Sequence, residues 1–220
     1  MGFLETLKTY ANKPISTVVL IVSKTRMSNG VCVGGIIEIT GEFIRLHNEH
    51  GGNLQFDAPY EIGDRWLLKV EKAWNSRPNP HSEDKQVKPI NKIKNVGIRG
   101  IINYLETHQL GNRFIKGSLD NAFEGYLNLS TSKNYINRCH IPSFSTQFWI
   151  ADCDLIHIEQ WNSHYYRYKD GIRIKYVGTQ TPIDRIPRGS IIRLSLANWW
   201  DGDGSGEERC YLQLSGWYIS

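Results

Sequence analysis

Aromatic and cationic side chains alternate closely in residues 161–176, WNSHYYRYKDGIRIKY, around the dipeptide Asp170-Gly171. Aromatic rings can stack on nucleic-acid bases, and lysine or arginine side chains can neutralise phosphates, so this composition suits contact with a nucleic acid. The same composition also occurs on an ordinary solvated strand face, where tyrosine and arginine pack as cross-strand pairs. Both interpretations require that the segment folds as two paired strands.

The Asp-Gly dipeptide predicts a two-residue hairpin turn, because both of its positions need positive φ angles. A turn of that length places Lys169 opposite Ile172 and so fixes the register of the whole ribbon. One face of the ribbon then carries the candidate nucleic-acid-binding residues, namely His164, Tyr166, Tyr168, Arg173 and Lys175.

A second group of cations follows residue 84, with no acidic residue before Arg99. The prolines, amides and charges of residues 75–95 indicate a linker. We therefore expect its lysines to be exposed and to contact phosphates. These candidates are Lys85, Lys88, Lys92 and Lys94.

Short apolar runs on either side of that segment predict strands. Residues 16–72 hold several β-branched or alternating runs, enough for one small barrel. Strand patterns resume after residue 113, where PRGSIIRLSL, led by Gly189, echoes GDRWLLKVE, led by Gly63. The echo suggests two copies of one small β-architecture.

A helix separates the two strand-rich regions. In residues 97–110 the apolar side chains recur at helical spacing, and Gly111 ends the pattern. The expected fold is mostly β, with two tandem OB-like small barrels joined by a linker and one helix. The expected segments are an N-terminal helix or extension (1–14), a first barrel (15–75), a basic linker with the helix (76–112) and a second barrel (113–220).

Composition indicates a globular protein. The 220 residues are 40% hydrophobic and 22% charged, and the net charge of +4 permits an acidic partner without requiring one. We see no apolar run long enough for a signal peptide or a membrane span. The isolated cysteines are typical of reduced thiols, so we expect a cytoplasmic protein with no membrane contact.

Catalytic motifs are missing from the sequence: it has no P-loop, dinucleotide fingerprint, nucleophile elbow or H-E-x-x-H pattern. His81, Glu83 and Asp84 in PHSED could act in acid–base chemistry or hold a metal, although a polar linker contains such groups by chance.

Two other groups could hold metal ions. Oxygen-bearing side chains alternate in residues 201–208, and a zinc site could form from Cys139, His140, Cys153 and His157. Neither group has an established metal-site spacing, so we expect no cofactor.

Several motifs carry a family resemblance over residues 16–220. The stretches SKTRMSNGVCVGGI, FIRL, APYEIGDRWLLKVEK, PHSED, PRGSIIRLSLANWW and ERCYLQLSGWY resemble the dual OB-domain (DuOB-type) proteins of prokaryotic immune and conflict loci. The resemblance implies two OB barrels in tandem and recognition of a nucleic acid or a partner beside a separate effector. Matching motifs add Lys24, Arg26, Arg45 and the PHSED residues as candidate contacts.

Three functions are compatible with these patterns. The first is a non-catalytic module of a prokaryotic defence system that recognises single-stranded or structured nucleic acid. The second is a docking or regulatory subunit of a nearby effector enzyme, because tyrosine, tryptophan and arginine also mark protein interfaces. The third is an enzyme that uses His81, Glu83 and Asp84.

Overall fold

The computed structural model describes residues 14–72, 78–202, 204 and 206–219. The helix predicted for residues 1–14 lies outside the described residues except for Pro14. Residues 73–77, which include the start of the predicted linker, lie outside them too, as do Asp203 and Ser205 of the predicted loop 201–208.

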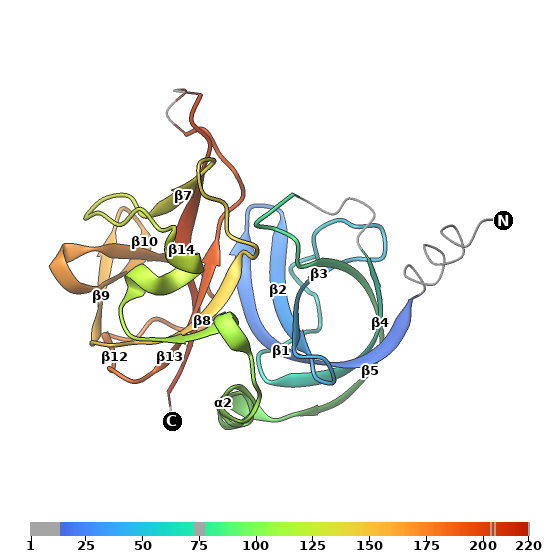
Figure 1. Cartoon of the computed structure of the whole chain (residues 1–220). Coiled ribbons are helices and arrows are strands. Elements are labelled where there is room, and N and C mark those ends of the chain that lie inside the picture. Colours follow the sequence, from blue (N-terminus) through green and yellow to red (C-terminus); the bar gives the residue numbers. More distant parts are fainter. Residues whose placement is uncertain (1–13, 73–77, 203, 205, 220) are drawn as a thin grey trace.

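The first barrel is a closed five-stranded sheet with the order β1-β2-β3-β5-β4, seen in blue to green in Figure 1. Its strands are β1 (Ile15–Met27), β2 (Gly30–Ile37), β3 (Glu42–His47), β4 (Asp64–Lys72) and β5 (Asp84–Asn95). The β-branched run in β1 is apolar on both faces because both are buried: Val19 and Ile21 belong to the barrel core, whereas Leu20 and Val22 belong to the cluster between the barrels.

The segment interpreted as a linker contains the strand that closes this barrel, so that part of the interpretation is wrong. Strand β5 pairs with β4 in antiparallel and with β3 in parallel orientation. Only Asp84 and Val87 in it are buried, so the apolar signal of a strand is nearly missing. Pro89 is tolerated because it lies at a shift in register opposite Leu67 and Leu68, where the ladder is already interrupted.

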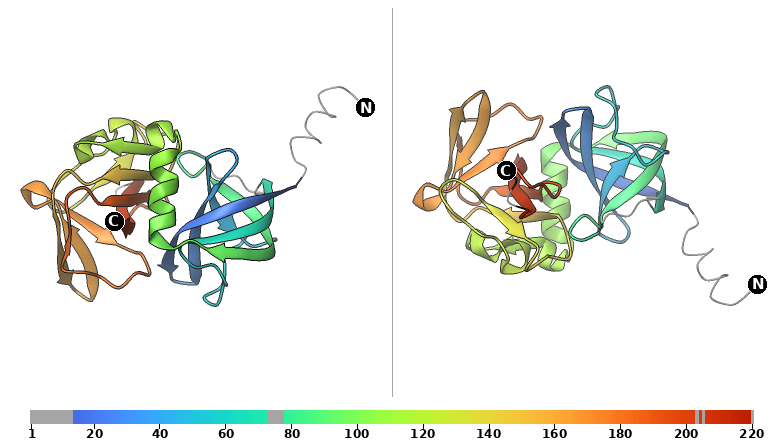
Figure 2. Two further views of the ribbon diagram at one scale, coloured as in Figure 1. Left: turned by 90° about the horizontal axis from the view of Figure 1, so that it is seen from below. Right: turned by 90° about the horizontal axis from the view of Figure 1, so that it is seen from above.

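Helix α2 (Gly97–Thr107) confirms the predicted helix and packs between the barrels, as Figure 2 shows. Its buried Ile101 and Leu105 join an apolar cluster with Phe43 of the first barrel and with Phe148 and Tyr218 of the second. A shared apolar interface of this kind fixes the two barrels relative to each other.

The second sheet has the order β12-β9-β10-β11-β14-β13-β8-β6, with β7 paired to β14. Its strands are β6 (Phe114–Lys116), β7 (Tyr135–Asn137), β8 (Thr146–Ile150), β9 (Leu155–Gln160), β10 (Ser163–Arg167), β11 (Arg173–Tyr176), β12 (Arg185–Ile186), β13 (Ile191–Leu196) and β14 (Arg209–Tyr218). Short 3-10 helices occur at η1 (Gly111–Arg113), η2 (Leu119–Gly125) and η3 (Lys169–Gly171).

The second sheet repeats the strand order of the first barrel. The path β9-β10-β11-β14-β13-β8 matches β1-β2-β3-β5-β4 when β8 and β9 are taken as one first strand, broken at residues 151–154. In each copy the third strand pairs in parallel with the fifth, β3 with β5 and β11 with β14. Gly63 and Gly189, which lead the two echoing runs, both have a φ of 88° and precede the fourth strand. The predicted mostly-β fold with two OB-type units is therefore confirmed.

The Asp170-Gly171 hairpin forms, but its predicted register is wrong by one residue. Both residues have positive φ angles, as expected. The loop, however, contains three residues, because the Tyr168 N–H donates to the Ile172 carbonyl at 2.8 Å. Tyr166 therefore lies opposite Ile174 rather than Lys175. A slip of one residue moves side chains to the opposite face of a strand, so the predicted faces are mixed.

Candidate functional site

Tyr166 and Tyr168, predicted to stack on bases, lie in the core of the second barrel. Tyr166 is 0% exposed and Tyr168 is 5% exposed. The Tyr166 hydroxyl donates to the Ile183 carbonyl at 3.0 Å, and the Tyr168 hydroxyl donates to Asp152 at 3.2 Å. The prediction of an exposed face with these two rings is therefore wrong, because the true register pairs them with isoleucines.

His164 and Arg173 are occupied by neighbouring groups. The His164 Nδ1 lies 3.0 Å from the Nε2 of His157, and the two rings stack. Arg173 donates to the Thr131 carbonyl at 3.1 Å and to the Gln160 side chain at 2.5 Å. These contacts leave Lys175 as the predicted residue of the hairpin that is most available to a ligand.

The solvent-side face of β10, β11 and β14, called here the outer face, carries a different set of residues. Tyr165 lies opposite Lys175, which in turn pairs with Gln213 of β14. Arg167 lies one row further along the hairpin. Arg167 and Lys175 are exposed and form no ion pair with any described residue. Tyr165 and Arg167 were missed because the sequence does not distinguish a two-residue turn from a three-residue one.

A group of aromatic rings borders the outer face along β14. Tyr211 alternates with the buried Cys210 and Leu212, so its ring is on the outer side. Trp200, 60% exposed, meets the Tyr211 ring edge-on with the ring centroids 5.9 Å apart, and the Tyr135 ring lies 6.0 Å from the Tyr211 ring. Partly exposed rings beside cations are suited to base stacking.

The lysines predicted to bind phosphates from the first barrel mostly have acidic partners. Lys85 pairs with Glu42 at 2.9 Å. Lys88 pairs with Glu49 at 3.4 Å. Lys92 reaches the buried Asp64 at 2.7 Å, and Lys94 is exposed. This strand therefore presents less free positive charge than its composition indicates.

The three candidates from the family motifs lie in different environments. Lys24 is buried and donates to Glu61 at 2.7 Å and to the Ala58 carbonyl at 3.2 Å, which is a structural role. Arg26 is exposed, and its backbone N–H donates to the Val177 carbonyl of the second barrel. Arg45 lines a cavity between the barrels.

This inter-barrel cavity has a volume of about 200 Å³. Strands β1, β2 and β3 of the first barrel and β8, β13 and β14 of the second contribute to its walls. Val177 and Gln213 line it as well, and both lie at the end of the outer face next to Lys175. The cavity and the outer face therefore form one continuous region.

Arg193 of β13 lines the cavity, although it is not among the candidate site residues predicted from the sequence. It is 5% exposed and lies in the wall with Arg45. Burial lowers the pKa of the Arg193 guanidinium, because the charged form loses its hydration. For Arg45, burial also opposes the charged form, but Cys32, Asp84 and Glu83 nearby raise its pKa overall.

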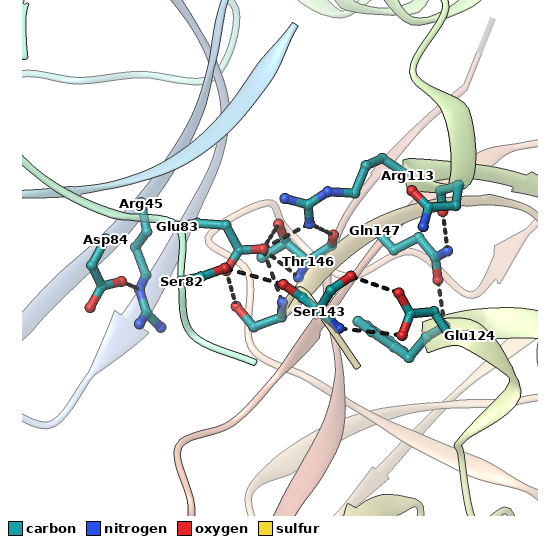
Figure 3. A network of polar contacts seen from close by, with 12 residues as sticks. Arg45, Ser82, Glu83, Asp84, Arg113, Glu124, Ser143, Thr146 and Gln147 are labelled. Carbon is teal, nitrogen blue, oxygen red and sulfur yellow. Dashed lines mark hydrogen bonds and ion pairs between the residues drawn. The ribbon is translucent and has the colours of Figure 1, made fainter. Parts of the chain in front are cut away.

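The PHSED residues His81, Glu83 and Asp84 contact different neighbours. His81 lies against the Cys210 sulfur at 3.7 Å, whereas Asp84 contacts Arg45 and His47. The three side chains have separate partners, and Figure 3 shows Glu83 and Asp84 pointing to different ones. Acid–base chemistry needs its groups within reach of one substrate, and these three side chains contact different neighbours.

Glu83 joins the first barrel to the second. Its carboxylate accepts hydrogen bonds from the backbone and hydroxyl groups of Ser145 and Thr146 at 2.6–3.1 Å. Arg113 also pairs with it at 2.8 Å, as Figure 3 shows. Burial by itself would raise the pKa of Glu83, but the Arg113 charge and the Ser145 hydrogen bonds lower it overall. The PHSED segment thus stabilises the contact between the barrels.

Metal ligands do not gather in the part of the chain that the structure describes: no three His, Cys, Asp or Glu side chains there could hold an ion. The candidate zinc ligands are also separated, since His140 lies against Tyr126 and His157 against His164. None of the described helices is long and apolar enough to cross a membrane.

Comparison with known proteins identifies one family. The family model described as "Dual OB-containing domain" (DuOB) matches residues 17–217. No curated protein matches the chain.

Two solved structures are similar at low identity. The crystal structure of the Ifi202 HINa domain in complex with 20-base-pair double-stranded DNA is 11% identical over 95% of each chain, with a TM-score of 0.35. A murine DNA-binding protein bound with double-stranded DNA is 11% identical over 94% of this chain and 97% of that one, with a TM-score of 0.30. The fold assignment rests on the strand order and the family model rather than on these two structures.

Proposed function

The chain belongs to the dual OB-containing domain family, and from this premise we propose that it is a non-catalytic module that binds single-stranded nucleic acid on the outer face of its second barrel. OB folds bind oligonucleotides on the face of their second and third strands, with the adjoining loops. The equivalent strands here are β10 and β11. The outer face lies on those strands.

The observation that carries this proposal is the state of the cations on the outer face. Arg167 and Lys175 are exposed without a carboxylate partner, and the partly buried Tyr165 ring lies directly opposite Lys175. By contrast, Lys85 and Lys88 of the first barrel are paired with glutamates. Cations with no protein partner can neutralise phosphates without first breaking an ion pair.

Single strands suit this face better than a duplex. Tyr165, Tyr211 and the exposed Trp200 offer ring faces or edges to unpaired bases, which a duplex keeps stacked inside. From Tyr165 through Lys175 to Gln213, the residues form a continuous row across β10, β11 and β14. A strand lying along this row reaches the inter-barrel cavity.

The defence setting implied by the family resemblance is part of this proposal. A recognition module without a catalytic cluster needs a separate effector to act on what it binds. A stoichiometric effector that co-purifies with the chain would support this setting. Retention of that effector after loss of Arg167 and Lys175 would show that docking uses another surface.

The proposal is tested by fluorescence-polarisation titrations of the full chain with labelled single-stranded DNA, the same sequence as RNA, and its duplex. We expect single strands to bind more tightly than about 10 μM and to weaken steeply as salt rises. No salt-dependent binding of any single strand below about 10 μM would overturn the proposal.

A further inference from the structure

The inter-barrel cavity carries positive charge that its walls do not balance. Its lining includes Arg26, Arg45 and Arg193, and among the described residues in the wall there is no aspartate or glutamate. Asp84, the partner of Arg45, is not part of the wall. Burying charge without a counter-charge costs stability, so a site of this kind favours an anionic ligand.

Arg193 has hydrogen-bonding capacity left over. Its Nη1 donates to the Ser215 hydroxyl at 2.8 Å, but its Nε has no hydrogen-bond partner among the described residues. Nor does any described carboxylate form an ion pair with it. Buried polar groups nearly always have partners in folded proteins, so a guanidinium without a carboxylate partner beside a cavity is suited to contact an anion or water held there.

Arg45 and His47 of the first barrel also have buried nitrogens without a hydrogen-bond partner among the described residues. The Arg45 Nε donates to Asp84 at 2.5 Å, and the His47 Nε2 lies 3.1 Å from the same carboxylate. The Arg45 Nη2 and the His47 Nδ1 remain without a hydrogen-bond partner in the described parts of the chain. Asp84 therefore orients both side chains, and both residues line the cavity.

The volume and the charge limit the occupant. About 200 Å³ is smaller than the roughly 300–1,000 Å³ of pockets for drug-sized ligands. A phosphate monoester carries about −1.5 to −2 charges and three terminal oxygens, and guanidinium groups match this geometry. We propose that the inter-barrel cavity binds a phosphate monoester between Arg193 of the second barrel and Arg45 of the first, with Arg26 at the mouth.

A phosphate monoester can come from two sources: the terminal phosphate of a nucleic-acid strand and a free mononucleotide. The outer face adjoins the cavity through Val177 and Gln213, so a strand that lies on that face can place its end there. For a strand end the inference rests on the proposed function. For a free mononucleotide it does not.

The test compares one short DNA strand with and without a terminal phosphate, at either end, for binding to the full chain. Adenosine monophosphate, adenosine and inorganic phosphate are titrated in parallel by calorimetry at constant ionic strength. We expect the phosphate to tighten binding of the strand or of the nucleoside by about ten-fold or more, as one charge-assisted hydrogen bond would.

Variants assign the effect to the cavity. Arg193→Gln should abolish the preference for the phosphorylated ligand, with folding checked by its thermal melt. Because Arg193 is buried, the exposed Arg26→Gln is a second variant, expected to reduce the preference by about two- to five-fold, as an exposed charge pair would. Lys88→Gln, on the first barrel outside the cavity, is the matched control and should leave the preference unchanged.

The outcomes separate this inference from the proposed function. If phosphorylated and unphosphorylated ligands bind alike, the cavity is not a phosphate site, whereas the nucleic-acid proposal stands. If adenosine monophosphate binds but strands do not, the cavity site stands and the nucleic-acid proposal fails. An equal loss of preference in Lys88→Gln and Arg26→Gln would assign the effect to overall charge and overturn the inference.

Discussion

Arg193 of the second barrel lies directly against Gly34 of the first. A Cβ atom built on Gly34 would be 2.4 Å from the Arg193 Nη2 and 2.6 Å from the Ser23 hydroxyl. These distances are far below van der Waals contact, so only glycine at residue 34 leaves room for the guanidinium. The Gly34-Gly35 pair in the sequence thus reflects a close approach between the barrels, next to a shift in register in β1.

Gly34→Ala should destabilise the chain by about 1–3 kcal/mol, the usual cost of overpacking a filled site. The free energy of unfolding in urea measures this cost. In Gly34→Ala/Arg193→Ala the clash with the guanidinium is relieved, although the one with the Ser23 hydroxyl remains, so the double variant should lose less than the sum of the single losses. Strict additivity of the two losses would contradict the contact.

Glu83→Gln should destabilise the chain by about 3 kcal/mol at neutral pH, because it leaves Arg113 without its buried counter-charge. The matched control is Glu42→Gln at the more exposed pair with Lys85, which should cost about 0–1 kcal/mol. Equal losses in the two variants would show that Glu83 does not hold the barrels together.

The same carboxylate predicts how stability depends on pH. The pKa of Glu83 is lowered in the folded chain, so its contribution is complete above the ordinary pKa of a glutamate. That contribution is lost as the pH falls from this value through the lowered pKa. Unfolding in urea from pH 7 to pH 3 should therefore show a smaller acid loss in Glu83→Gln than in the wild type, and an identical loss would contradict the linkage.

Tyr165 and Tyr166 are neighbours with opposite predicted roles. Tyr166→Phe removes a buried hydroxyl that contacts the Ile183 backbone, so it should cost about 1–3 kcal/mol of stability and leave binding intact. Tyr165→Ala should retain stability and weaken single-strand binding by about 1–3 kcal/mol. Thermal melts and binding titrations on both variants test this. Loss of binding in Tyr166→Phe together with loss of stability in Tyr165→Ala would contradict the three-residue turn and its register.

The cysteines should differ in their reactivity with thiol reagents. Cys139 is exposed, whereas burial raises the pKa of the Cys210 thiol to about 12. Only thiolates react quickly, so at pH 8 Cys139 should be alkylated first and Cys210 only after unfolding. Mass spectrometry of timed alkylation follows each site, and early labelling of Cys210 would show that its barrel opens.

Much of the fold could be predicted from the sequence because local signals agree with it. The β-branched run of β1, the amphipathic α2 and the repeated turns at Gly63 and Gly189 all follow from periodicity and glycine placement. Strand β5 could not, because every residue after Val87 in it is exposed, so it shows no alternating apolar pattern.

The candidate site was harder to predict, because it depends on register and on distant contacts. The residues Asp170-Gly171 suit turns of two and of three residues, and this difference exchanges Tyr166 for Tyr165 on the surface. Arg193 is a single cation in an ordinary alternating strand, and nothing local shows that it meets Gly34. The hairpin register and the position of Arg193 both depend on tertiary packing, which composition does not show.

The most direct test of the nucleic-acid proposal is the salt dependence of single-strand binding in two double variants that remove the same charge. Arg167→Ala/Lys175→Ala changes the outer face, and Lys88→Ala/Lys94→Ala changes β5 of the first barrel. We predict that the outer-face variant binds about ten-fold more weakly. Its slope of log affinity against log salt should be about 1.4 smaller in magnitude than that of the wild type, whereas the β5 variant should keep the wild-type slope. Equal changes in both variants, or none in the outer-face variant, would contradict the account.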